Sequence, residues 1–272
     1  MCNAGYGGNL CHKCVEHEGS KYERLQLNTC SKCPPKGANF FRVIVMMLLV
    51  FVLIVLLILL NLKKRKESNM STLMRIMTNY LHMLTATASF NIGYPTYLVS
   101  FYEPGLYFGD TDALVSIDCF IEDEQLNLFG SSHSYLKAAI AMITPLVLIT
   151  ILAAYWTIAA VLGKTDRGRN NFILSSVVVL YLLHPSLTAS CLGLFNCMEL
   201  DNGQMWLLKD LQVRCWTRSH LSYALVIGTP MLIFWVIGLP VVGFVLIYRH
   251  KNHLQNDEVL AKYRMLYQGL RP

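Results

Sequence analysis

The sequence predicts an all-α fold, a polytopic transmembrane helix bundle of about five crossings, with a small disulfide-rich stub at its N-terminus. Composition is the first observation, because hydrophobic residues make up 54% of the chain and charged residues only 15%. An ordinary soluble domain carries ~25% charged residues. Long apolar runs are the second observation, and the placement of nine cysteines is the third. Together they predict an integral membrane protein.

The N-terminal segment, residues 1–39, contains two CxxC pairs. Cys11 and Cys14 form the first pair, Cys30 and Cys33 form the second, and fifteen residues separate them. This spacing is typical of a four-cysteine zinc site. The alternative is a disulfide-bonded extracellular module, which so short a segment would need because it cannot bury enough apolar surface. We favour disulfides over zinc.

Cys2 and the glycines at positions 5, 7 and 8 complete the pattern of this segment. The whole string resembles the glycine- and cysteine-rich EGF-like repeats of surface proteins in single-celled eukaryotes. Modules of this type usually work in tandem, so we expect Cys2 to pair upstream of residue 1. Five cysteines before the first helix are also an odd number. The chain is accordingly expected to be a fragment of a larger surface protein.

Five segments are long enough to cross a membrane at ~1.5 Å per residue. Four are plainly apolar, and the fifth lies within a stretch that has no Asp, Glu, Lys or Arg between Arg75 and Glu103. The predicted crossings are residues 40–62, 77–97, 136–162, 172–195 and 221–248.

Basic clusters fix the predicted orientation. They lie at residues 63–66, 164–169 and 249–251, and short basic loops tend to stay cytoplasmic. Only a chain with the crossing at 77–97 places all three clusters on one side. We therefore predict an extracellular N-terminus and a cytoplasmic C-terminus, in the plasma membrane. The remaining predicted parts are a basic linker at 63–76, a four-helix domain at 77–248 with outer loops at 103–134 and 198–220, and a tail at 249–272.

Cysteine placement supports this topology. Every cysteine outside a predicted helix falls on the extracellular side, as oxidised thiols would. Cys191 lies inside the fourth helix and is expected to be an ordinary buried thiol. Cys197 could pair with Cys215, or either could pair with Cys119. The predicted disulfide cysteines are Cys2, Cys11, Cys14, Cys30, Cys33, Cys119, Cys197 and Cys215.

A polar stripe marks the second predicted helix. Its residues recur at steps of four, three and four, which places them on one face. They either hydrogen-bond neighbouring helices or line an ion or solute pathway. His184, which precedes a proline, either satisfies backbone freed by that proline or acts as a gating group. The stripe comprises Thr78, His82, Thr85 and Ser89.

Prolines inside apolar helices are predicted hinges, since each removes a backbone hydrogen bond. They are Pro145, Pro185, Pro230 and Pro240. No HExxH, GxSxG or P-loop motif is present in the sequence, and no pair of acids lies within a predicted helix. We therefore predict a protein that is not an enzyme, with no catalytic residues, no metal and no cofactor.

Several short motifs follow one another at residues 79–80, 88–91, 94–95, 116–119, 194–197, 210–216 and 262–269. In this order they resemble the membrane domain of the transient-receptor-potential-like proteins of fungi and protists. The similarity covers roughly residues 70–270. It implies a cation-channel-like bundle that continues beyond this chain.

The predicted function is that of a channel-like or sensory membrane protein of the cell surface. The alternative is an adhesion or receptor protein whose cysteine-rich repeats bind a partner while the helices anchor it. The expected partners are the lipid bilayer, the upstream and downstream parts of the same protein, and further copies in a homo-oligomer. Nucleic acid is excluded, because the basic residues cluster at the ends of apolar segments.

Overall fold

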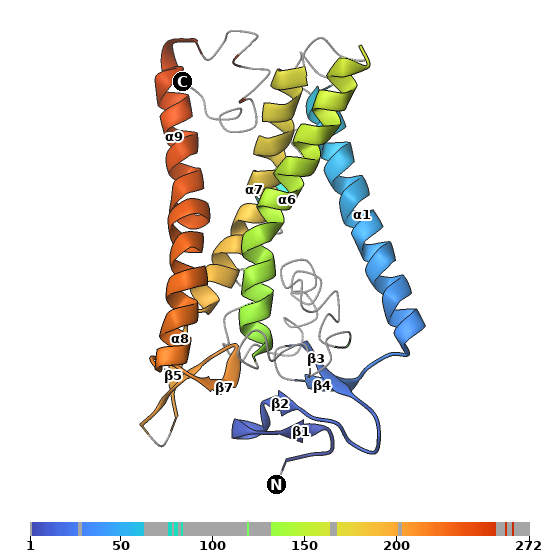
Figure 1. Cartoon of the computed structure of the whole chain (residues 1–272), viewed down its shortest axis with the longest axis vertical. Coiled ribbons are helices and arrows are strands. Elements are labelled where there is room, and N and C mark those ends of the chain that lie inside the picture. Colours follow the sequence, from blue (N-terminus) through green and yellow to red (C-terminus); the bar gives the residue numbers. More distant parts are fainter. Residues whose placement is uncertain are drawn as a thin grey trace.

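Long helices run between two ends of the molecule, and short strands gather at one of these ends (Figure 1). The structure is a computed structural model. It describes residues 2–26, 29–62, 132–163, 168–200 and 203–253, together with the single positions Ile76, Met77, Asn79, Tyr80, Met83, Cys119, Val259 and Tyr263.

Three of the long helices are unbroken: α1 (Lys36–Leu62), α6 (His133–Val161) and α7 (Gly168–Gly193). A fourth helical run joins α8 (Arg218–Tyr223) to α9 (Leu239–Arg249). Between them lie two π-helical segments, η4 (Ala224–Gly228) and η5 (Met231–Gly238).

Four of these helices are long and apolar enough to cross a membrane. The qualifying stretches are Gly37–Leu56, Ser134–Val161, Gly168–Gly193 and Met231–Arg249. Large apolar side chains cover the outer surface of the helices, for example Phe51 in α1 and Phe234 in η5. In water such a surface would be an aggregation hazard, so the mostly helical structure is consistent with a membrane protein.

Helix α7 is the central helix of the described bundle. Ile58 of α1 packs with Leu174 and Val178 near the first half of α7. Near its other end, Cys191 packs with Met231 of η5. Helix α6 also packs along α7. The bundle is therefore organised around one helix that contacts the three others.

Helices α1 and α6 both begin at the end where the strands gather and run to the opposite end (Figure 1). The end of α1 and the start of α6 therefore lie at opposite ends of the molecule (Figure 1). The crossing predicted at 77–97 falls in this interval but lies outside the described residues, apart from Met77, Asn79, Tyr80 and Met83, which are helical. The basic linker, most of the loop 103–134 and much of the tail also lie outside them.

The predicted hinge prolines all lie within helical runs. Pro145 is inside α6 and Pro185 is inside α7. Pro230 and Pro240 precede and follow η5. Because proline has no N–H, each of these residues removes one donor from the backbone hydrogen bonds of its helical run. Hinge motion at these prolines stays a prediction.

In the part of the chain that the structure describes, three small antiparallel sheets accompany the helices, so the all-α prediction was incomplete. The N-terminal segment pairs β1 (Tyr6–Gly7) with β2 (Lys13–Cys14), and β3 (Tyr22–Gln26) with β4 (Thr29–Lys32). A short 3-10 helix, η1 (Asn9–Cys11), lies between β1 and β2. After α7 the chain forms a three-stranded sheet of β5 (Cys197–Glu199), β6 (Met205–Leu207) and β7 (Asp210–Arg214), in that order. Strands this short carry too little alternation to reveal themselves in a sequence.

Candidate functional site: the β7 platform

All eight cysteines predicted to form disulfides are paired in the structure. The prediction of disulfide bonds is therefore confirmed, and the sulfurs of the two CxxC pairs are not free to bind zinc. Cys191 alone of the nine cysteines is free, and it is buried. The four bonds are Cys2–Cys11, Cys14–Cys30, Cys33–Cys119 and Cys197–Cys215.

The expected upstream partner for Cys2 was wrong, because Cys2 pairs with Cys11. The odd fifth cysteine of the N-terminal segment is Cys33, which reaches Cys119 across 86 residues of sequence. Sequence spacing could not reveal this bond, since its two halves belong to segments separated by α1. We call residues 2–35 the head, and residues 197–220 the β7 platform.

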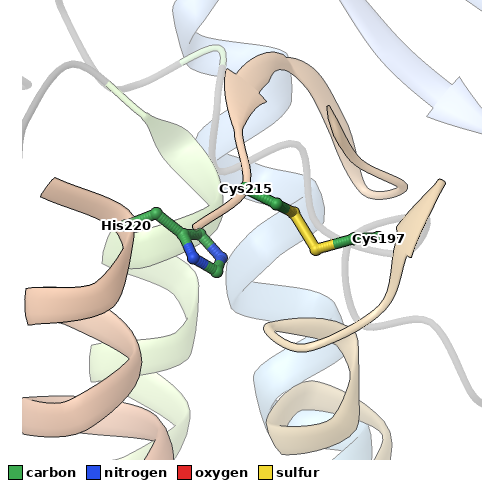
Figure 2. A group of neighbouring side chains, drawn as sticks. All are labelled: Cys197, Cys215 and His220. Carbon is green, nitrogen blue, oxygen red and sulfur yellow. A yellow bond between two sulfur atoms is a disulfide. The ribbon is translucent and has the colours of Figure 1, made fainter. Parts of the chain in front are cut away.

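His220 lies next to the Cys197–Cys215 disulfide and links the β7 platform to the end of α7 (Figure 2). Its Nε2 lies 3.1 Å from the carbonyl oxygen of Leu194, directly after α7, and its Nδ1 accepts a hydrogen bond from the N–H of Trp216 at 3.3 Å. A carbonyl oxygen only accepts, so Nε2 is the donor in this contact. Only 1% of His220 is exposed. It therefore fixes the end of α7 against the start of α8.

The two disulfide cysteines and His220 also form a group of residues of the types that bind metals. One atom each from Cys197, Cys215 and His220 lie within 4.8 Å of one another. Both sulfurs are consumed by the disulfide, however, and both ring nitrogens already have backbone partners. The arrangement is a structural cross-link, not a built metal site.

Strand β7 also holds the head. The side-chain amide of Asn9 donates a hydrogen bond of 2.8 Å to the carbonyl of Leu211. Beside it, Gly8 has φ +69° and lies so close to Gln212 that a Cβ would stand 2.4 Å from the Gln212 Nε2. Any larger residue at position 8 would be strained by its backbone and would clash with Gln212. Gly8 thus permits the close contact between head and strand.

The opposite connection of β7 is to helix α6. Asp210 accepts a hydrogen bond of 3.0 Å from the hydroxyl of Ser132, the residue that precedes α6. Tyr135 of α6 stacks on Tyr223 of α8 with ring centroids 4.3 Å apart. Val213 of β7 packs against the same apolar cluster, which includes Ile227 of η4.

Strand β7 is consequently the place where the head meets the bundle. Within five residues it contacts the head through Leu211 and Gln212, α6 through Asp210, and the last helical run through Val213. His220 adds the link to α7. Chemically this arrangement offers no nucleophile or acid–base pair. It offers mechanical continuity between the disulfide-bonded head and three helical runs.

The predicted polar stripe is not among the described residues, so Thr78, His82, Thr85 and Ser89 have no assigned surroundings. Asn79, their neighbour, accepts a hydrogen bond from the Tyr181 hydroxyl of α7. This contact brings the start of the predicted second crossing against the central helix.

His184 lies in α7, before the β7 platform in the chain. Its Nε2 lies 3.3 Å from the carbonyl oxygen of Val236 in η5, so the histidine links α7 to the last helical run. Both alternatives for His184, satisfying backbone freed by Pro185 or acting as a gating group, stay predictions.

Neither Asn9 of the head nor His220 of the platform was predicted as a contact residue, and Asp210 and Trp216 fell within the motif at residues 210–216 without an assigned role. The only local signal was a histidine and a tryptophan close to Cys215, at the start of an apolar run.

Comparison with known proteins yields a limited similarity. No protein-family model matches the chain, and no solved structure matches it. A stretch of 100 residues is 28% identical to Cysteine repeat modular protein A of Toxoplasma gondii, and it covers 34% of this chain. The same stretch covers 3% of that protein, so the chain spans only a small part of the relative's length. Together with the disulfide-rich N-terminal segment, the similarity fits a cysteine-rich repeat.

Proposed function

We propose that this chain is part of a sensory membrane protein of the cell surface, in which the head receives an extracellular event and strand β7 passes it to the helices. The observation that carries the proposal is the continuity of β7 with both sides. Its Leu211 carbonyl accepts from Asn9 of the head, and its Asp210 accepts from Ser132 beside α6. A simple anchor would need one helix and no such connection.

The proposed orientation is head outside and residue 249 inside. All four disulfides lie in the head, in the β7 platform or between the head and Cys119, whereas the free thiol of Cys191 is buried in the bundle. Disulfides persist in oxidising surroundings, which supports an extracellular side for the head and the platform. The plasma membrane is the proposed location.

A channel-like activity is the finer form of the proposal. It rests on the resemblance of residues 70–270 to transient-receptor-potential-like membrane domains, and on the polar stripe from Thr78 to Ser89. Widened π-helical turns in η4 and η5 support a helix able to change shape, because such turns are frequent at functional sites.

The second candidate is an adhesion or receptor protein whose head binds a partner while the helices serve as an anchor. The partial similarity to a protein named for its cysteine repeats favours it. The two candidates differ in one respect. In a sensory protein a structural change in the head must be transmitted to the helices, whereas in an adhesion protein it need not be.

Hydrogen–deuterium exchange of the protein in lipid nanodiscs distinguishes these candidates. Asn9→Ala removes the hydrogen bond to Leu211, and Gly8→Leu places a side chain on a backbone with φ +69° and crowds the Gln212 amide. We expect both variants to raise amide exchange in β7 and in residues 224–238. Glu16→Ala, an exposed change in the head outside its strands, is the matched control and should leave exchange in both regions unchanged.

Faster exchange confined to the head would contradict coupling and favour the adhesion protein. Amide exchange equal to that of the wild type in every region of both variants would contradict the contact between the head and β7.

A further inference from the structure

Trp216 is held in an unusual outward position at the edge of the β7 platform. It has φ +62°, the left-handed region that a non-glycine residue rarely adopts, and 57% of it is exposed. Both neighbours are fixed: Cys215 forms a disulfide, and the Thr217 hydroxyl caps α8 by accepting the N–H of His220. The surrounding structure therefore imposes this conformation on a large aromatic side chain.

The position of Trp216 coincides with the ends of the apolar helices. Its ring packs edge-on against His220 with centroids 5.8 Å apart. His220 in turn contacts Leu194, one residue after α7 ends, and lies 6.3 Å from Tyr135 at the start of α6. The candidate spans of these two helices end at Gly193 and begin at Ser134. Trp216 thus lies at the level where the apolar surface of the bundle begins.

Two arginines flank this tryptophan. Arg214 and Arg218 are exposed, and no described carboxylate lies within 4.0 Å of either guanidinium. On the side where the head lies, basic residues run against the positive-inside tendency. A local anionic partner would explain two exposed guanidinium groups beside an indole.

We propose that Arg214, Trp216 and Arg218 form an interfacial phospholipid site, in which the indole lies among the headgroups and the arginines bind lipid phosphate. Tryptophan is enriched at this depth because its ring is amphipathic, and guanidinium groups match phosphate geometry. The inference rests on the proposed membrane insertion. It adds a ligand class, the anionic headgroup, and fixes the depth of the β7 platform.

The test uses the whole chain reconstituted in vesicles of phosphatidylcholine, with and without phosphatidylserine. Emission of Trp216 is obtained as the difference between the wild type and Trp216→Phe. Nitroxide labels on the headgroup or at mid-chain report its depth. We expect stronger quenching by the headgroup label, and stronger quenching by labelled phosphatidylserine than by labelled phosphatidylcholine.

Arg214→Gln combined with Arg218→Gln should reduce the preference for phosphatidylserine about fivefold for each arginine. Arg42→Gln is the matched control, because it removes an exposed positive charge near the start of α1, at the same end of the molecule. It should leave Trp216 quenching unchanged.

The outcomes separate this inference from the proposed function. Trp156 in α6 and Trp235 in η5 lie within the apolar helices, so their quenching by mid-chain labels reports insertion itself. Unquenched emission from both tryptophans would overturn the proposed membrane insertion. Quenching of these two with Trp216 unquenched, or with an unchanged lipid preference in the double arginine variant, would overturn only the lipid site. If soluble glycerol phosphate abolishes the preference for phosphatidylserine, the ligand is a free phosphate. This result would also overturn the lipid site.

Discussion

Replacing His220 with alanine should destabilise the junction between the β7 platform and the bundle. The imidazole is 1% exposed and makes two hydrogen bonds, one to the Leu194 carbonyl and one from the Trp216 N–H. Removing it leaves the Leu194 carbonyl without a donor and the Trp216 N–H without an acceptor. Each buried polar group left without a partner costs about 1–3 kcal/mol, so the pair costs about 2–6 kcal/mol. Even the lower figure would raise the population of the opened junction about thirtyfold.

Cys191 provides the assay. It is the only free cysteine of the chain, it is 0% exposed, and its sulfur lies 3.6 Å from the Gly228 carbonyl in η4. A fluorogenic maleimide therefore labels it only when the bundle opens, while the disulfide-bonded cysteines stay silent. We expect His220→Ala to label at least tenfold faster than the wild type under mild denaturation.

Conservative variants of His220 test its two hydrogen bonds separately. Asparagine keeps an acceptor near the position of Nδ1, and glutamine keeps a donor near the position of Nε2. Each should therefore fall between the wild type and alanine. Ser219→Ala changes an exposed neighbour and should label like the wild type. If His220→Ala labels no faster than Ser219→Ala, the role assigned to the imidazole is refuted.

Three further predictions address topology, packing and conduction. After reduction of intact cells, a membrane-impermeant thiol reagent should label Cys119, Cys197 and Cys215, and labelling only after permeabilisation would overturn the proposed orientation. Gly228→Leu should lower the free energy of unfolding by about 1–3 kcal/mol, because even a Cβ would stand 2.8 Å from the Phe195 ring; Gly37→Leu in α1, where a Cβ meets open space, provides a comparison for added bulk. Replacing Thr78, His82, Thr85 and Ser89 together with leucine should reduce conductance of the full-length protein in patch clamp, and unchanged conductance would defeat the pathway interpretation.

Helix positions were predictable because a hydrophobic run long enough to span a membrane satisfies its own backbone hydrogen bonds. The first helix was expected at residues 40–62 and is observed at Lys36–Leu62. The third was expected at 136–162 and is observed at His133–Val161. Differences of a few residues at the ends reflect polar residues that continue the helix beyond its apolar part.

The β7 platform was not predictable, because its contacts join residues far apart in the chain. Asn9 and Leu211 are 202 positions apart, and nothing in either neighbourhood specifies the other. The placement of the cysteines predicted that they form disulfides, but it did not predict that Cys33 pairs with Cys119. The π-helical segments have a similar explanation, since Pro230 and Pro240 were visible but the way in which the backbone absorbs them depends on neighbours such as His184.

The Cys33–Cys119 disulfide affects how the head could be released by a protease. Between its two cysteines the chain passes through the whole of α1. A single cut anywhere from residue 34 to residue 118 therefore leaves the head covalently joined to the part of the chain that carries Cys119. Release of the head would require reduction of this bond as well as cleavage. Proteolysis of the junction would change the constraint on the bundle without removing the head from the protein.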